Sequence, residues 1–184
     1  MTLSPTNSGR LQEKFRRIRL LAMDVDGVLT DGRITYGDAG IETKTFHVHD
    51  GLGIRLLLHH GIRVCVVTGR RSEALQRRCR ELGIDAVFDG VSDKAAVMDE
   101  IRSRWQLAEE DIACMGDDLP DMAMMEQAGL RIAVADAREP VKSMADVVTR
   151  SAGGKGAVRE ICDRILKSQG KWEEAMQRFR WKQT

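Results

Sequence analysis

Acidic side chains follow two short apolar runs of the sequence, at the point where each run ends. The first run leads into Asp24-Val25-Asp26-Gly27, and a later run leads into Gly116-Asp117-Asp118-Leu119-Pro120-Asp121. If these carboxylates meet in a small volume, their mutual repulsion raises their pKa values unless a cation lies among them. A hard dication such as Mg²⁺ prefers carboxylate oxygens, waters and a substrate phosphate, whereas zinc prefers nitrogen and sulfur ligands. The spacing therefore predicts a magnesium site at these aspartates.

The Asp-x-Asp pair and two later residues predict hydrolysis of a phosphate ester. A carboxylate can attack phosphorus to form an aspartyl-phosphate, and a second acid can protonate the leaving alkoxide and then deprotonate water. Asp24 and Asp26 suit these two tasks, as nucleophile and as general acid/base. Thr68 follows the second apolar run and can donate its hydroxyl to the phosphate, while Lys94 can spread the charge of the phosphate oxygens.

Apolar runs and helical patterns alternate along the chain, which is typical of an open parallel sheet with helices on both faces. The runs that we interpret as strands are 18–25, 62–67, 84–88, 112–115, 131–134 and 146–149. The segments that we interpret as helices are 52–60, 72–82, 92–105, 120–128, 139–144 and 157–167. Because the site of such a sheet lies at the carboxyl ends of its strands, the residues after each run are expected to meet there.

A β-hairpin signal interrupts this alternation directly after the first predicted strand. Segments 33–36 and 41–46 flank the turn Gly37-Asp38-Ala39-Gly40, so we expect a hairpin at about residues 33–46. An isolated two-stranded hairpin is only marginally stable in water. With no cap domain in the sequence to cover it, another subunit is its expected partner.

The composition bounds the class of protein. The chain has 184 residues, of which 42% are hydrophobic and 31% charged, and its net charge is +1. These values exclude a disordered chain and do not indicate a nucleic-acid-binding protein. No apolar run approaches the about 18 residues of a membrane-spanning helix, and the cysteines form no C-x-x-C pair. We expect a cytoplasmic protein with one domain over residues 1–184 and with reduced, mostly buried thiols.

In their order along the chain, these motifs resemble those of the haloacid dehalogenase superfamily, which implies a Rossmann-like fold of that type. The residues that the resemblance implies as catalytic are Asp24, Asp26, Thr68 and Lys94. The ligands that it implies for Mg²⁺ are the carboxylates of Asp24 and Asp117 and the backbone carbonyl of Asp26, with Asp118 and Asp121 supporting the metal shell.

Three further segments are similar to those of the capless 3-deoxy-D-manno-octulosonate (KDO) 8-phosphate phosphatase family. They are Asp50-Gly51-Leu52-Gly53-Ile54-Arg55, Gly90-Val91-Ser92-Asp93-Lys94 and Gly153-Gly154-Lys155-Gly156-Ala157-Val158-Arg159-Glu160, and the similarity covers about residues 15–170. The resemblance implies a magnesium-dependent phosphatase that releases KDO for lipopolysaccharide biosynthesis. It also implies a homotetramer formed through the hairpins, in which a neighbour completes each site and the tail at about 170–184 folds over an adjacent site.

Arg70 bears on the choice of substrate. Relatives that act on nine-carbon sugar-acid 9-phosphates tend to carry Glu after the Thr-Gly pair, where this chain has Arg70. A guanidinium pairs bidentately with a carboxylate, so Arg70 favours the octulosonate. Arg78 is a second candidate for substrate binding, and a solvated helix face is an equally good interpretation of it. A phosphatase of a nine-carbon acid is the alternative function.

Other classes of function fit the sequence less well, and several residues have simpler interpretations. A phosphorylated receiver domain carries its phosphorylated aspartate on a middle strand, whereas Asp24 follows the first, and a catalytically silent domain would lack a motif residue. The four histidines are expected to be structural or exposed, Met122, Met124 and Met125 are expected to pack in the core, and 153–156 is expected to be a mobile turn. The tail carries Trp172, Phe179 and Trp181 among basic residues. We interpret it as a lid over a neighbouring site, with a membrane-surface contact and a frayed end as the alternatives.

Overall fold

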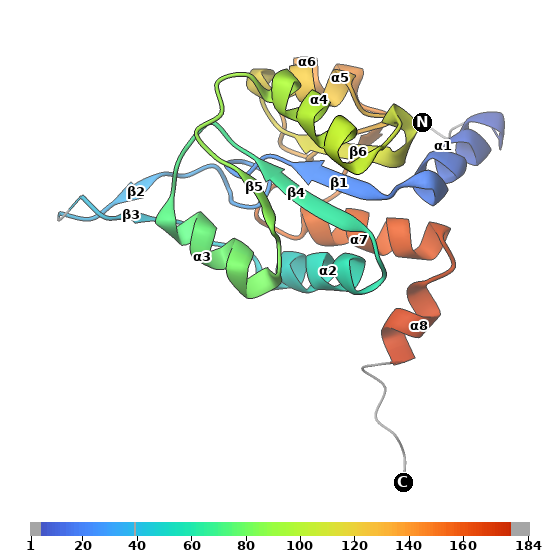
Figure 1. The fold of residues 1–184 in the computed structure, drawn as a ribbon, viewed down its shortest axis with the longest axis horizontal. Helices are drawn as coiled ribbons and strands as arrows, with labels where there is room; N and C mark the ends of the chain where they lie inside the picture. Colours follow the sequence, from blue (N-terminus) through green and yellow to red (C-terminus); the bar gives the residue numbers. More distant parts are fainter. Residues whose placement is uncertain (1–4, 39, 178–184) are drawn as a thin grey trace, which may run out of the picture.

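The computed structural model describes residues 5–38 and 40–177, which form a six-stranded sheet covered by helices (Figure 1). All neighbouring strands of this sheet are parallel, in the order β5-β4-β1-β6-β7-β8. The strands are β1 (Leu20–Met23), β4 (Arg63–Val67), β5 (Ala86–Phe88), β6 (Ile112–Gly116), β7 (Leu130–Ala133) and β8 (Val147–Val148). The predicted α/β fold is confirmed, and the described residues contain no cap domain.

The helices lie in two layers, one on each side of the sheet. Figure 1 shows α2, α3 and α7 below the sheet and α4, α5 and α6 above it. Their bounds, with those of two 3₁₀ turns, are α1 (Pro5–Arg17), α2 (Val48–His59), α3 (Glu73–Leu82), α4 (Lys94–Trp105), η1 (Glu109–Asp111), η2 (Leu119–Asp121), α5 (Met122–Glu126), α6 (Glu139–Met144), α7 (Ala157–Ser168) and α8 (Trp172–Gln177).

Each predicted helix is present, with differences at the ends. α2 begins at Val48 rather than at Leu52, and the helix expected over 120–128 is divided into η2 and α5 because Asp118 caps a separate first turn. The sequence interpretation did not include α1. Met124 and Met125 are buried in the core, as predicted.

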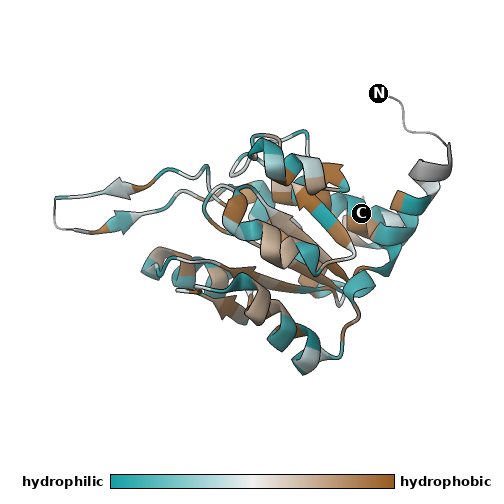
Figure 2. Cartoon of the chain, turned by 90° about the horizontal axis from the view of Figure 1, so that it is seen from above, coloured by the Kyte–Doolittle hydropathy of each residue, from teal (hydrophilic) through white to brown (hydrophobic). Residues whose placement is uncertain are grey.

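β1 lies at the centre of the sheet because its residues are apolar on both faces. Leu20, Leu21, Ala22 and Met23 are fully buried, with β4 on one side and β6 on the other. An apolar run without alternation is the pattern of a parallel strand that is covered on both faces. Figure 2 shows the strands mainly in brown, the hydrophobic end of the scale, with most teal residues on the outer surfaces of the helices. The central position of β1 brings the residue that follows it, Asp24, to the middle of the sheet edge.

The predicted hairpin is present as β2 (Thr35–Tyr36) and β3 (Glu42–Thr43), which pair antiparallel and project from the body (Figure 1). Its paired part is shorter than predicted, with two residue pairs in register. Ile34, Tyr36 and Ile41 are large apolar side chains that it exposes. Such a concentration of exposed apolar surface is typical of a contact surface.

The C-terminal segment is more ordered than the expected tail. Trp172 begins α8, packs partly buried against the core, and has the Lys167 Nζ 4.6 Å from the centre of its ring. The interpretation of Trp172 as part of a lid is therefore corrected, because its ring packs within its own chain. Phe179 and Trp181 lie outside the described residues.

The four cysteines are free and buried, as predicted. None of the described helices combines the length and the apolar character needed to cross a bilayer.

Candidate active site

The carboxyl ends of three adjacent strands bring the predicted residues together. Asp24 follows β1, Thr68 follows β4 and Asp117 follows β6, and Met23 is in register with both Val66 and Met115. The backbone N–H of Asp24 continues the ladder by donating to the Met115 carbonyl at 3.1 Å. Parallel strands in register place the residues that follow them at one sheet edge, so these three side chains share a site.

Lys94 joins this edge from the first turn of α4. Its Nζ donates to Asp24 Oδ1 at 2.5 Å and to Asp121 Oδ1 at 2.6 Å. The three side chains are 8%, 9% and 3% exposed, in the order Lys94, Asp24 and Asp121. Asp93 caps α4 by accepting hydrogen bonds from the N–H groups of Ala95 and Ala96, which fixes where the helix begins. Because Lys94 is the first residue of α4, the cap fixes its position relative to the site.

Asp121 organises the loop that follows β6. Its Oδ2 accepts hydrogen bonds from the N–H groups of Asp117 and Asp118, at 2.9 and 3.2 Å, while its Oδ1 faces Lys94. Asp118 accepts from the Leu119 N–H at 2.8 Å and caps η2. Both residues thus support the loop that carries Asp117, and Asp121 also reaches the centre of the acidic cluster.

Three carboxylates converge closely enough to share one cation. One oxygen from each of Asp24, Asp117 and Asp121 lies within 4.8 Å of the others. Burial, followed by the charges of Asp121, Asp24 and Asp118, raises the pKa of Asp117 to about 8. Burial and the charge of Asp121 raise the pKa of Asp24 to about 6, although Lys94 opposes this shift. Asp117 Oδ1 is buried without a hydrogen-bond partner in the described part of the chain. This all-oxygen set with an unpartnered carboxyl oxygen fits a hard dication such as Mg²⁺.

Gly27 makes room for this cluster. A Cβ at Gly27 would lie 2.1 Å from Asp117 Oδ2, and its φ of +104° is unfavourable for other residues. Gly153 packs on Gly27 in turn, since a Cβ there would lie 1.6 Å from the Gly27 carbonyl oxygen. Gly154 N–H donates to the Val28 carbonyl at 2.9 Å. Instead of the mobile turn expected at 153–156, the structure has a segment packed against the loop that follows β1, which the sequence interpretation missed.

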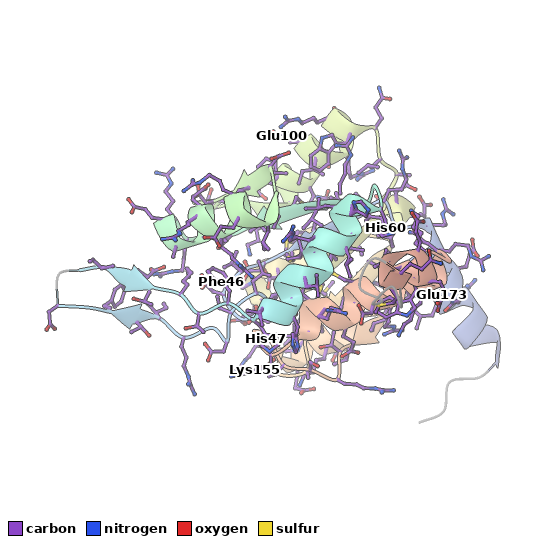
Figure 3. The ribbon with its side chains drawn as sticks, turned by 90° about the horizontal axis from the view of Figure 1, so that it is seen from below. Phe46, His47, His60, Glu100, Lys155 and Glu173 are labelled. Atoms are coloured by element: carbon purple, nitrogen blue, oxygen red, sulfur yellow. The ribbon has the colours of Figure 1, made fainter. Side chains whose placement is uncertain are left out.

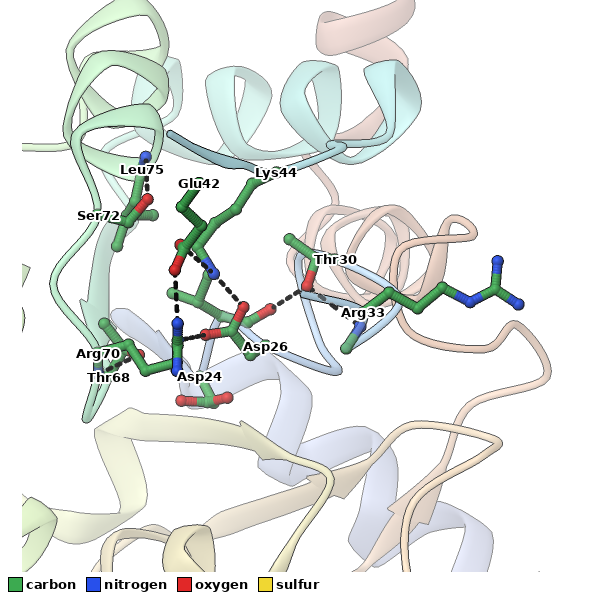
Figure 4. A network of polar contacts seen from close by, with 12 residues as sticks. Asp24, Asp26, Thr30, Arg33, Glu42, Lys44, Thr68, Arg70, Ser72 and Leu75 are labelled. Atoms are coloured by element: carbon green, nitrogen blue, oxygen red, sulfur yellow. Dashed lines mark hydrogen bonds and ion pairs between the residues drawn. The ribbon is translucent and has the colours of Figure 1, made fainter. Parts of the chain in front are cut away.

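The side chain of Asp26 lies beside the hairpin rather than in the acidic cluster (Figure 4). Lys44 Nζ donates to Asp26 Oδ1 and lies 3.3 Å from Glu42 Oε1. Arg70 Nη2 lies 2.5 Å from Glu42 Oε2 and 3.2 Å from the Tyr36 hydroxyl, while its Nε lies 3.8 Å from Asp26 Oδ2. The sequence interpretation missed Glu42 and Lys44, because charged residues of a hairpin usually face solvent.

Arg70 and Arg78 differ in their distance from the site. Arg70 lines the cavity beside Thr68, and its backbone N–H donates a hydrogen bond to Thr68 Oγ1 at 3.3 Å. Arg78 does not line this cavity; its Nη1 lies 3.5 Å from Glu81 Oε2, and its side chain packs against Gly51 of α2. Within one chain, the structure thus brings Arg70 to the site and leaves Arg78 outside it.

A cavity of about 500 Å³ opens over this arrangement. Its volume is enough for a phosphate ester of a small sugar acid. The four histidines do not line it. Its lining residues are Asp24, Asp26, Thr68, Gly69, Arg70, Val91, Ser92, Asp93, Lys94, Asp117, Asp118, Pro120, Asp121 and Ala123.

Comparisons with known proteins agree with this geometry. The family model of haloacid dehalogenase-like hydrolases matches residues 86–161. A curated 3-deoxy-D-manno-octulosonate 8-phosphate phosphatase of Escherichia coli K12 is 48% identical over 162 residues, which are 88% of this chain and 86% of that protein. The corresponding protein of Yersinia pestis is 47% identical over 163 residues, 89% of this chain and 87% of that protein.

Solved structures give the same result. One similar structure is the crystal structure of the 3-deoxy-D-manno-octulosonate 8-phosphate phosphatase of Moraxella catarrhalis in complex with magnesium ion, phosphate ion and KDO. It superposes with a TM-score of 0.91 at 39% identity and covers 94% of this chain and 99% of that chain. The Yersinia pestis enzyme superposes with a TM-score of 0.87 at 46% identity, covering 89% and 88% of the two chains. The chain therefore belongs to the 3-deoxy-D-manno-octulosonate 8-phosphate phosphatase family of the haloacid dehalogenase-like hydrolases.

Proposed function

We propose that this protein is a magnesium-dependent phosphatase that hydrolyses KDO 8-phosphate to KDO and inorganic phosphate, a step that supplies lipopolysaccharide biosynthesis. One observation carries the proposal: carboxylate oxygens of Asp24 and Asp117 lie close enough to share a cation, next to Asp121, with Lys94 bonded to the predicted nucleophile. The identity to curated phosphatases of this substrate supports the choice of sugar acid.

In the proposed mechanism, Asp24 and Asp26 divide the reaction into two steps. An Asp24 carboxylate oxygen bonds to phosphorus while the bond from phosphorus to the ester oxygen breaks, and Asp26 gives its proton to that oxygen. Water then bonds to phosphorus, Asp26 takes the proton from it, and the bond between phosphorus and Asp24 breaks. Inorganic phosphate leaves, and both aspartates return to their starting states.

The remaining residues position the phosphoryl group and offset its charge. Lys94 offers its buried ammonium group and Thr68 its buried hydroxyl group at the cavity wall. Magnesium, when bound, would be held by Asp24, Asp117 and the Asp26 backbone carbonyl and would supply positive charge that offsets the carboxylates and the phosphoryl oxygens. Asp118 and Asp121 would keep the loop of Asp117 in place through the hydrogen bonds described above.

Arg70 is the proposed contact for the sugar acid. It lines the cavity, and its side chain is 38% exposed, so its guanidinium can reach a substrate carboxylate. A nine-carbon sugar-acid 9-phosphate is the less favoured substrate, because the curated relatives are phosphatases of KDO 8-phosphate. Arg78 is kept as a substrate-binding candidate only for an assembly in which another chain brings it to a site.

A phosphate-release assay tests the proposed function. KDO 8-phosphate, a nine-carbon sugar-acid 9-phosphate and glucose 6-phosphate are compared in Mg²⁺ and in excess chelator, with Asp24→Asn as the isosteric control. We expect the highest kcat/KM for KDO 8-phosphate, no release in chelator and none from the variant. A higher kcat/KM for the nine-carbon substrate would select the alternative function, and activity of the Asp24→Asn variant would refute the mechanism.

We also propose a cytoplasmic homotetramer in which the hairpins form the contact and a neighbour completes each site. The exposed Ile34, Tyr36 and Ile41 of the hairpin support this assembly. Light scattering coupled to size exclusion measures its mass, and replacing Ile34 and Ile41 by Asp is expected to produce monomers. A wild-type monomer would refute the assembly, and a location outside the cytoplasm on cell fractionation would refute the compartment.

A further inference from the structure

The hairpin sends two charged side chains back into the active site. Glu42 lies in β3 and Lys44 lies two residues later, on the same side of an extended chain. The Lys44 side chain is 2% exposed, whereas Tyr36 of the same hairpin is 64% exposed. A buried ammonium group on an otherwise exposed element indicates a specific task, because a buried charge is stable only when it is paired.

The contacts of Lys44 make the two carboxylate oxygens of Asp26 different from each other. Oδ1 accepts a hydrogen bond from Lys44 Nζ, which also lies 3.3 Å from Glu42 Oε1 (Figure 4). Oδ2 is buried and has no hydrogen-bond partner in the described residues, with Arg70 Nε 3.8 Å away. Glu42 closes the network by binding Arg70 Nη2 through Oε2 at 2.5 Å.

We infer that Lys44 is a positioning residue for the general acid/base, an inference that rests on the proposed function. Lys44 occupies Oδ1, so Oδ2, on the Arg70 side of the carboxylate, is the oxygen left free for the reaction at the cavity that Asp26 lines. Oδ2 is then the oxygen that gives its proton to the leaving ester oxygen as the phosphorus–oxygen bond breaks, and that takes a proton from water in the second step. Glu42 holds Lys44 from the far side, so the hairpin sets the geometry of the leaving-group step.

The dependence on the leaving group separates this role from simple structural support. An alkyl phosphate such as KDO 8-phosphate needs a proton on its leaving oxygen, whereas para-nitrophenolate leaves without one. Lys44→Met keeps the aliphatic stem and removes the ammonium group. We expect it to lower kcat for KDO 8-phosphate by about 100-fold, the lower range of a general-acid contribution, and kcat for para-nitrophenyl phosphate by less than about 3-fold. Lys44→Arg is expected to restore part of the first activity.

Lys14→Met is the matched control, because Lys14 also pairs with an aspartate, Asp146 at 2.7 Å, but in a part of the molecule outside the cavity lining. It is expected to leave both activities unchanged. Equal losses of Lys44→Met on the two substrates, or no loss on either, would overturn the inference. Circular dichroism checks that the variant is folded, and if it is not, Lys44→Arg and Glu42→Gln carry the same comparison.

The failure of the proposed function is distinguishable from the failure of this inference. If the wild type releases no phosphate from KDO 8-phosphate but hydrolyses another alkyl phosphate, the substrate proposal fails and the comparison with para-nitrophenyl phosphate is made with that alkyl ester. A crystal structure of Lys44→Met adds a readout besides activity. We expect the Asp26 carboxylate to be rotated or shifted relative to its wild-type position, and an Asp26 in the wild-type position would contradict the positioning role.

Discussion

Removing the ammonium group of Lys94 should destabilise the protein strongly in the absence of metal. Lys94 lies between the carboxylates of Asp24 and Asp121, and all three side chains are less than 10% exposed. Breaking a buried ion pair from one side costs about 3–5 kcal/mol, because the remaining charge stays buried without compensation. We expect Lys94→Met to lower the free energy of unfolding by this amount at pH 7.5 in EDTA, measured by urea denaturation.

The pH dependence and a control make this prediction specific. The folded-state pKa of Asp24 is already raised to about 6 with Lys94 present, and removing the cation raises it further. Protonation at lower pH then removes the buried charge, so the loss should be smaller at pH 5.5 than at pH 7.5. Lys14→Met, at a pair whose lysine is 33% exposed, should cost less than about 1 kcal/mol. A loss from Lys94→Met no larger than this control would refute the reasoning.

Three further predictions concern the metal cluster and the substrate. In chelator, stability should fall as pH rises from about 5 to 8. The reason is that the folded-state pKa values of Asp24 and Asp117, about 6 and about 8, lie above the ordinary aspartate value of about 3.9. Thermal melts with and without Mg²⁺ check this, and a pH-independent melting temperature in chelator would contradict it. Gly27→Ala should weaken Mg²⁺ binding at least about tenfold, because the added Cβ displaces Asp117, and misplacing a metal ligand costs about as much affinity as losing a residue that supports one. Calorimetry measures the affinity, and an unchanged value would show that the loop relaxes freely. Arg70→Gln should raise KM for KDO 8-phosphate by about 10- to 100-fold through loss of a charged hydrogen bond and leave para-nitrophenyl phosphate nearly unaffected, whereas equal changes would mean that Arg70 only supports the hairpin.

The part of the site at the strand ends could be predicted from the sequence. Leu20–Met23 and Ile112–Gly116 are apolar on both faces, a pattern that few elements other than a central parallel strand can satisfy. Asp24 and Asp117 directly follow these strands, so the two side chains were expected to lie at the same sheet edge once both strands run parallel in one sheet. The order of the strands itself was not predicted, and the site did not depend on knowing it.

The contacts made by tertiary folding could not be predicted in this way. Lys44 follows a two-residue strand, where no periodicity distinguishes a buried charge from a solvated one. Gly153 meets Gly27 across a large separation in sequence, and only the packed structure shows that neither tolerates a Cβ. α1 was missed for another reason: its many cations dominate the segment, although Leu11 and Phe15 lie at helical spacing and pack on the core.

The distribution of lysines among the aspartates explains where positive charge is still missing. Lys94 pairs with Asp24 and Asp121, and Lys44 pairs with Asp26 from the hairpin side. Within residues 5–38 and 40–177, Asp117 forms no ion pair; its pKa is raised further than that of Asp24, which keeps a lysine, and one of its oxygens has no hydrogen-bond partner. A cation bound at Asp117 would therefore relieve the least compensated carboxylate. The two lysines thus leave the Asp117 part of the cluster as the place where a dication would be stabilised most, next to Asp24, the predicted nucleophile.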